Sequence, residues 1–203
     1  MDMLLNILTK MIYILLIVFA YLVGSIPIGV LLVKLKGKDP SKVGSGNIGA
    51  TNVMRSAGKA LGIVTLIGDI AKGFIPTFIA MRLGEPAFII ALVGLAAFSG
   101  HLFPVFLKFK GGKGVATGAG VFLAISPPII LISFVIFVIV FLVWKYVSLG
   151  SLVGTAIIPL SFTLLKAPLE YILLALLIAC GVFIKHKDNI KRLLTGTENK
   201  VKF

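Results

Sequence analysis

The first predicted loop, residues 34–59, is rich in glycine and contains the first side chains that could do chemistry. Gly44, Gly46 and Gly49 match the dinucleotide-binding spacing G-x-G-x-x-G, but that spacing has meaning only after a strand, and none is expected here. Glycines still let a backbone approach a ligand closely, and an arginine adds a fork suited to phosphate. The candidate binding residues of this segment are Gly44, Ser45, Gly46, Asn47, Thr51, Asn52 and Arg55. The alternative is that its polar residues cap a helix and that its arginine only reflects membrane topology.

A second glycine-rich segment, residues 100–120, ends in a predicted helix. Lys113 lies between Gly112 and Gly114, directly before that helix, which is the arrangement expected of a loop around a phosphate. It is not a Walker A motif, because the first glycine and the magnesium-binding Ser or Thr are both missing. We expect Gly111, Gly112, Lys113 and Gly114 to bind an anion, whereas the nearby Lys108 and Lys110 fit membrane topology.

The C-terminal segment, residues 185–200, is basic and polar. His186 and Asn189 are three residues apart, so they share a face if the preceding helix continues beyond the membrane. Glu198 follows a turn at Gly196 and could pair with a loop cation. Attraction to anionic lipid is the alternative explanation for most of the Lys and Arg residues here.

A few further polar residues lie near or inside apolar segments. Ser148 and Ser151 follow the fifth predicted helix and carry a weak signal by themselves. Asp69 and Lys72 are spaced i, i+3 within an apolar helix, where charges are costly enough to need a partner or a function. A structural ion pair and a pair lining the site both remain open. His101, near the end of another apolar helix, fits a structural role.

Several kinds of chemistry are disfavoured by what the sequence lacks. Its two histidines and one cysteine form no cluster at metal-ligand spacing, so we expect neither a metal nor another cofactor. The predicted inner face has few carboxylates, which disfavours paired-carboxylate catalysis. The His-x4-Asp motif of acyl-CoA acyltransferases and a serine nucleophile elbow are both absent. Cys180, alone in an apolar run, is expected to be an inert core residue.

The composition predicts a membrane protein that must position these loops. Of 203 residues, 59% are hydrophobic, and the mean hydropathy is +1.12. A spanning helix needs about 20 apolar residues. Apolar runs occupy residues 11–33, 60–81, 86–107, 115–144, 147–165 and 169–184. The net charge of +13 is explained more simply by topology than by nucleic acid, which we do not expect as a partner.

The fourth apolar run is too long for one span and is interrupted by Ser126, Pro127 and Pro128. A turn there gives helices at 115–125 and 129–144. The prediction is one all-α integral membrane domain, residues 1–203, with seven transmembrane helices, the N-terminus outside and the C-terminus in the cytoplasm. In this orientation the inner loops hold most of the Lys and Arg residues. The outer side keeps only the cations Lys10, Arg82 and Lys166, as the positive-inside rule requires. Residues 115–125 are short for a full crossing.

Taken together, the loops resemble those of the bacterial acyl-phosphate:glycerol-3-phosphate acyltransferase family, PlsY. The resemblance covers nearly the whole chain. It rests on GSIPIG at residues 24–29, GSGNIGATN at 44–52 followed by Arg55, GDIAKG at 68–73, GHLFPVFLKFKGGKGVATGAG at 100–120, and HKDNIKRLLTGTE at 186–198.

The resemblance implies an acyltransferase that moves a fatty acyl group from acyl phosphate to the 1-hydroxyl of glycerol 3-phosphate. The products are lysophosphatidic acid and phosphate, in the first step of bacterial phospholipid synthesis. By the resemblance, Ser45, Arg55, Lys113, His186 and Asn189 are catalytic, Glu198 maintains integrity, and the second loop binds glycerol 3-phosphate. The base is either His186, with an unperturbed pKa near 6.5, or a substrate phosphate.

The expected partners are glycerol 3-phosphate, a fatty acyl phosphate and membrane lipids, with the monomer as the functional unit. The expected location is the bacterial inner membrane, with the site facing the cytoplasm. A carrier of anions or phosphate esters is the rival function, since basic inner loops would attract such a solute, but a carrier commonly has an internal repeat. A lipid-binding scaffold without activity is a second rival, and it would not need Lys113 among glycines.

Overall fold

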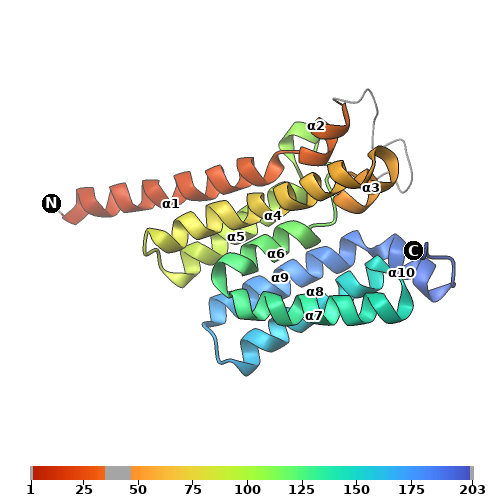
Figure 1. Ribbon diagram of the computed structural model, residues 1–203. Helices are drawn as coiled ribbons and strands as arrows, with labels where there is room; N and C mark the ends of the chain where they lie inside the picture. Colours follow the sequence, from red (N-terminus) through yellow and green to blue (C-terminus); the bar gives the residue numbers. More distant parts are fainter. Residues whose placement is uncertain (1, 35–46, 202–203) are drawn as a thin grey trace.

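The computed structural model describes residues 2–34 and 47–201, and these residues form helices and loops without a strand (Figure 1). The elements are α1 (Asp2–Ser25), α2 (Ile28–Lys34), α3 (Ala50–Ala57), α4 (Lys59–Arg82), α5 (Ala87–Leu102), the 3-10 turn η2 (Val105–Leu107), α6 (Val115–Ile125), α7 (Pro127–Trp144), α8 (Val147–Leu164), α9 (Leu169–Lys185) and α10 (Lys187–Leu194).

The long helices run side by side in a bundle (Figure 1). Helix α1 packs on α5, α4 packs on α6, and α7 packs on α8, while α9 contacts both α5 and α8. Glycines allow the closest of these approaches. A Cβ at Gly73 would lie 2.1 Å from the carbonyl oxygen of Thr117, and one at Gly120 would lie 2.0 Å from that of Ile70. The backbones of α4 and α6 therefore touch directly, as small residues permit in membrane helix pairs.

Five helical segments among the described residues are long and apolar enough to cross a membrane: Asp2–Lys34, Lys59–Arg82, Ala87–Leu107, Pro127–Trp144 and Val147–Leu164. Helices α9 and α10 together would add a sixth, but they are bent by 63°. Helix α6 is a shorter apolar helix of 11 residues. At a rise of about 1.5 Å per residue it spans roughly half of the hydrocarbon core.

The predicted break in the fourth apolar run is confirmed. Helix α6 ends at Ile125, and α7 begins at Pro127 rather than at residue 129. Prolines suit the first helical positions because the N–H groups there have no partner within the helix.

Other features differ from the predictions, and prolines account for two of the differences. The first helix begins at Asp2 instead of residue 11 and is interrupted at Pro27. The third predicted helix, 86–107, ends at Leu102 because Pro104 redirects the chain into η2. Cys180 was expected in the core, but it is exposed on the surface of α9.

The polar segments gather at one end of the bundle. Figure 1 shows α2, α3, α10 and the C-terminus together at that end, with the N-terminus at the other. The turns between α4 and α5, α6 and α7, and α8 and α9 lie at the opposite end. The fold therefore brings segments far apart in the sequence to one place.

Candidate active site

A cavity of about 450 Å³ opens among the polar segments and extends between the helices. Its polar wall includes residues from α3, the start of α6, the start of α8 and the C-terminal segment. Its deeper wall is apolar and is formed mainly by α4, α6, α7, α8 and α9. The apolar lining residues include Leu66, Ile70, Phe122, Leu123, Ile130, Phe134, Phe137, Ile158 and Ile178. A single cavity therefore has a charged mouth and an apolar interior.

Several helices begin at the mouth of this cavity. Among the described residues, the first turns of α3, α6 and α8 all contribute to its wall, and His186 and Asn189 add the start of α10. The first N–H groups of a helix have no carbonyl partner within the helix. These N–H groups and the helix dipoles favour an anion at the mouth.

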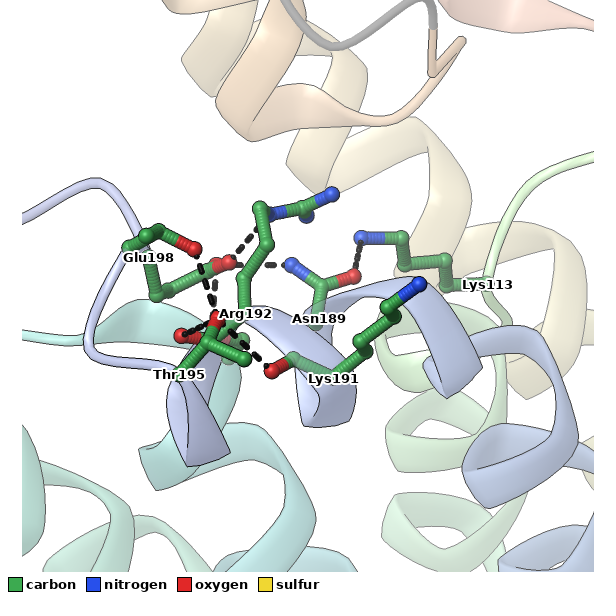
Figure 2. A network of polar contacts seen from close by, with 8 residues as sticks. Lys113, Asn189, Lys191, Arg192, Thr195 and Glu198 are labelled. Atoms are coloured by element: carbon green, nitrogen blue, oxygen red, sulfur yellow. Dashed lines mark hydrogen bonds and ion pairs between the residues drawn. The ribbon is translucent and has the colours of Figure 1, made fainter.

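The start of α6 has the geometry that the second loop predicted. Gly114 caps the helix with φ of 85°, a left-handed conformation that favours glycine, and no side chain caps the first turn. Lys113, Gly114, Val115 and Ala116 all line the cavity. The Lys113 Nζ donates to the side-chain oxygen of Asn189 (Figure 2). Burial lowers the pKa of Lys113, while the charge of Glu198 acts in the opposite direction.

Glu198 is the centre of a polar network that holds the C-terminal segment in place (Figure 2). Its Oε1 accepts hydrogen bonds from the Asn189 amide at 2.7 Å and the Ser148 hydroxyl at 2.9 Å. Its Oε2 accepts from Nε of Arg192 at 2.6 Å. Although burial raises the pKa of Glu198, these hydrogen bonds and the Arg192 charge outweigh it and lower the pKa overall. Glu198 was expected to pair with a loop cation; it does pair with a cation, but that cation is Arg192 on α10.

His186 lies at the bend between α9 and α10 and lines the cavity. Its Nδ1 is 2.8 Å from the carbonyl oxygen of Val182, which fixes Nδ1 as the protonated nitrogen of the neutral ring and leaves Nε2 as an acceptor. Burial lowers its pKa to about 4, so the ring is neutral near neutral pH. The helix does not continue straight as expected, yet His186 and Asn189 still reach the same cavity.

The first loop contributes its described part to the mouth. Asn47, Thr51, Asn52 and Arg55 line the cavity. The Asn47 side-chain oxygen accepts from the Gly49 N–H at 2.8 Å, which shapes the turn into α3. Gly44, Ser45 and Gly46 lie outside the described residues. Ser148 and Ser151 also line the cavity, but they belong to the first turns of α8 rather than to a loop.

Two glycines of the second loop have a different environment from the expected one. Gly111 and Gly112 are not among the cavity-lining residues, and both pack on His101. A Cβ at Gly111 would lie 2.1 Å from the His101 carbonyl oxygen, and one at Gly112 would lie 2.2 Å from its Nε2. These glycines let the loop pass closely over the end of α5.

The buried charges of α4 form an ion pair beside the cavity. Lys72 Nζ is 2.8 Å from Asp69 Oδ1 and also donates to the Ile26 carbonyl at 3.2 Å. Asp69 lines the cavity and Lys72 does not. His101 is also buried and lines the cavity, with its Nδ1 3.7 Å from Asp69 Oδ1. The two readings left open by the sequence therefore both apply to Asp69.

Sequence reasoning overlooked two residues that line the mouth, Arg192 and Asn199. Arg192 stands in a run of basic residues for which attraction to anionic lipid is a sufficient explanation. No spacing in the sequence marks Arg192 as the cation of that run that pairs with Glu198. The apolar wall was also not predicted in detail, because helix-to-helix register is not encoded in a hydropathy pattern.

Comparison with known proteins gives consistent matches over nearly the whole chain. The family model described as "Glycerol-3-phosphate acyltransferase" matches residues 14–196. A glycerol-3-phosphate acyltransferase of Geotalea daltonii is 52% identical over 189 residues, covering 93% of this chain and 97% of that protein. The crystal structure of PlsY, an integral membrane glycerol 3-phosphate acyltransferase, is similar in its glycerol 3-phosphate form, with a TM-score of 0.92, 43% identity, and coverage of 94% of this chain and 96% of that one. Its lysophosphatidic acid form has a TM-score of 0.89 and 42% identity, with coverage of 94% and 95%.

Proposed function

Because the chain belongs to the glycerol-3-phosphate acyltransferase family, we propose that it transfers a fatty acyl group from acyl phosphate to the 1-hydroxyl of glycerol 3-phosphate. It is a membrane enzyme of phospholipid synthesis. The products of the proposed reaction are lysophosphatidic acid and inorganic phosphate. The acyl-phosphate donor and the roles of individual residues are the parts of this proposal that go beyond family membership.

The observation that carries the proposal is the joined cavity. Its mouth has cations and helix N-termini, whereas its interior is apolar. Both proposed substrates are phosphate esters or anhydrides, and the donor also has a fatty tail. A single site with one anionic and one apolar region matches a pair of substrates of this kind. A nucleotide-bearing donor such as acyl-CoA would need a further, larger polar surface.

Phosphate binding is assigned to the start of α6 and the cations around it. Lys113, held by Asn189, presents its ammonium group beside the uncapped first turn of α6. Arg55 and Arg192 line the same mouth from α3 and α10. We propose Asn47, Thr51, Asn52, Gly114, Ser148 and Ser151 as further substrate contacts, with Gly44, Ser45 and Gly46 joining them on the strength of the family resemblance.

The proposed reaction requires no covalent intermediate with the protein. An acyl phosphate is a mixed anhydride, so its carbonyl carbon is already activated and phosphate is a good leaving group. The 1-hydroxyl oxygen attacks that carbon, the carbonyl reforms, and the bond to the phosphate oxygen breaks. Positioning of the two substrates and stabilisation of the developing negative charge are the main requirements. Lys113 and Arg55 supply the positive charge.

The proton of the attacking hydroxyl passes to a substrate phosphate in this proposal. A general base works best when its pKa is near the working pH. The pKa of His186, lowered to about 4, is well below a neutral working pH. A phosphate monoester has a second pKa of about 6. The neutral His186 instead accepts a hydrogen bond at Nε2 and orients the hydroxyl. Retention of near-normal turnover by His186→Ala would remove this orienting role.

We further propose that the chain crosses the membrane seven times, with the active site facing the cytoplasm and the N-terminus outside. The site end of the described chain carries most of its cations, while Arg82 and Lys166 lie at the opposite end. Positive charge collects on the cytoplasmic side of inner-membrane proteins. Helix α6, packed against α4, α5 and α7, would be the short seventh crossing.

The rival carrier function predicts polar groups near the middle of the bundle. The polar lining here instead concentrates at one end, which favours the enzyme. Purified protein given labelled glycerol 3-phosphate and either palmitoyl phosphate or palmitoyl-CoA tests the donor. Product from palmitoyl phosphate alone supports the proposal. Product from palmitoyl-CoA alone would assign a different donor, and no product from either in protein that binds glycerol 3-phosphate would favour the carrier.

A further inference from the structure

The buried imidazole of His101 lies directly behind the loop that ends in Lys113. Only 4% of this side chain is exposed, and it belongs to the last turn of α5. The Gly112 N–H donates to the His101 carbonyl oxygen at 3.1 Å. The His101 ring also fills the space where a side chain at residue 112 would stand, because a Cβ there would come within 2.2 Å of Nε2. Gly112 is therefore fixed by both the backbone and the ring of one residue.

The other edge of the same ring faces a charged pair. His101 Nδ1 is 3.7 Å from Asp69 Oδ1, and among the described residues it has no hydrogen-bond partner. Asp69 is itself held by Lys72, whose Nζ also donates to the carbonyl oxygen of Ile26. That carbonyl lies at the break between α1 and α2, just before Pro27. The imidazole thus stands between a buried, well-anchored carboxylate and the glycine next to Lys113.

We infer that His101, oriented by Asp69, is a positioning residue that sets the place of Gly112 and hence of the Lys113 ammonium group in the phosphate site. This inference rests on the proposed function, since Lys113 is assigned there to substrate phosphate. This role also gives a reason for the glycine at residue 112, which does not line the cavity although its neighbour Lys113 does. The absence of a side chain at residue 112 makes room for the His101 ring rather than for the ligand.

The arrangement is open to a steric double-mutant cycle. Gly112→Ala drives a methyl group into the ring, so the loop must move away from α5. His101→Ala removes the surface on which the loop rests. A hydrogen bond to a charged group is worth enough to change an affinity about 10-fold to 100-fold, so each single change, by displacing Lys113, is expected to weaken glycerol 3-phosphate binding by about that factor. In the double variant the new methyl occupies space vacated by the ring, so its loss should be no larger than that of the worse single variant.

The dissociation constant for glycerol 3-phosphate is the readout, measured by calorimetry on each variant that elutes as a single species. Binding needs no turnover, so the cycle remains informative even if the enzyme uses another donor or does not transfer acyl groups. In steady-state assays the KM for glycerol 3-phosphate should rise while the KM for the acyl donor changes little. If His101→Ala does not fold, His101→Gln enters the same cycle.

A spectroscopic measurement separates positioning from bulk packing. The chain has only two histidines, so isotope-labelled imidazoles give two signals, which His186→Gln assigns. We expect glycerol 3-phosphate to shift the His101 signals and Asp69→Asn to alter their tautomer pattern. Coupling in the cycle together with these shifts supports the inference. Two results would overturn it. One is a double variant whose loss of affinity equals the product of the two single losses, and the other is His101 signals that respond neither to glycerol 3-phosphate nor to Asp69→Asn.

Discussion

The side chains of Asn189 and Glu198 are joined by a 2.7 Å hydrogen bond from the amide of the first to Oε1 of the second. The amide oxygen of the same Asn189 accepts from Lys113. The Glu198 carboxylate therefore orients the Asn189 amide, which in turn holds Lys113 at the proposed phosphate site. Residues 76 positions apart in sequence, Lys113 and Asn189, become neighbours through this chain of contacts.

Removing the charge of Glu198 should loosen both ends of this network. Glu198→Gln leaves Arg192 without its ion-pair partner. It also places an amide N–H donor of the glutamine opposite the Arg192 Nε–H donor. We expect the variant to lose about 1–3 kcal/mol of stability, the usual cost of breaking a partly buried, charge-assisted hydrogen bond. Unfolding in detergent measures this loss. Glu85→Gln at the far end of the bundle is the matched control, and equal losses in the two variants would contradict the anchoring role.

Loss of the Lys113 charge should reduce catalysis far more than it reduces stability. Lys113→Met keeps most of the length of the side chain and removes the ammonium group at the cavity mouth. Deleting one preorganised donor typically costs about 100-fold to 1,000-fold in kcat, and a fall of that order is expected. Lys110→Met changes an exposed lysine of the same loop that does not line the cavity. Comparable kinetics for the two variants would show that only overall charge matters.

Gly114 should tolerate a methyl group poorly for two separable reasons. Its φ is 85°, and a Cβ would meet the Phe98 ring at 2.4 Å. Gly84 has a similar φ of 73° but open space around it, at the end of the bundle away from the site. Both alanine variants should therefore lose the roughly 1 kcal/mol that the left-handed conformation costs. Only Gly114→Ala should also lose activity, by about 10-fold or more through displacement of α6 and Lys113.

The lowered pKa of His186 predicts a particular pH dependence of stability. In the unfolded chain this group binds a proton below its ordinary pKa of 6.5, whereas in the folded protein it does so only below about 4. Between these values the unfolded state holds more protons, so stability falls as the pH falls. His186→Gln should flatten that part of the curve. Unfolding midpoints at several pH values between them provide the measurement, and identical slopes for the variant and the wild type would show that the folded pKa is not lowered.

Much of this arrangement could be predicted from residues read one by one. The proline pair after Ser126 located the break between α6 and α7, and glycines flanking Lys113 located the start of α6 at the site. Spacing along a continuing helix was expected to place His186 and Asn189 together, and both do line the cavity, although the chain bends between α9 and α10. The role of Gly112 was different from the expected one, because contact with His101 depends on how the loop turns back at Pro104. Arg192 was missed because nothing in a basic segment distinguishes the cation that turns inward.

The central claim is that one cavity brings glycerol 3-phosphate and an acyl phosphate together for direct transfer. The most direct test supplies purified protein with glycerol 3-phosphate and palmitoyl phosphate labelled in its phosphate group, and counts both products over time. The account predicts equimolar lysophosphatidic acid and inorganic phosphate, with all of the label in the inorganic phosphate, and parallel loss of both in Lys113→Met. Release of labelled phosphate without lysophosphatidic acid, or no reaction in folded protein that binds glycerol 3-phosphate, would contradict it.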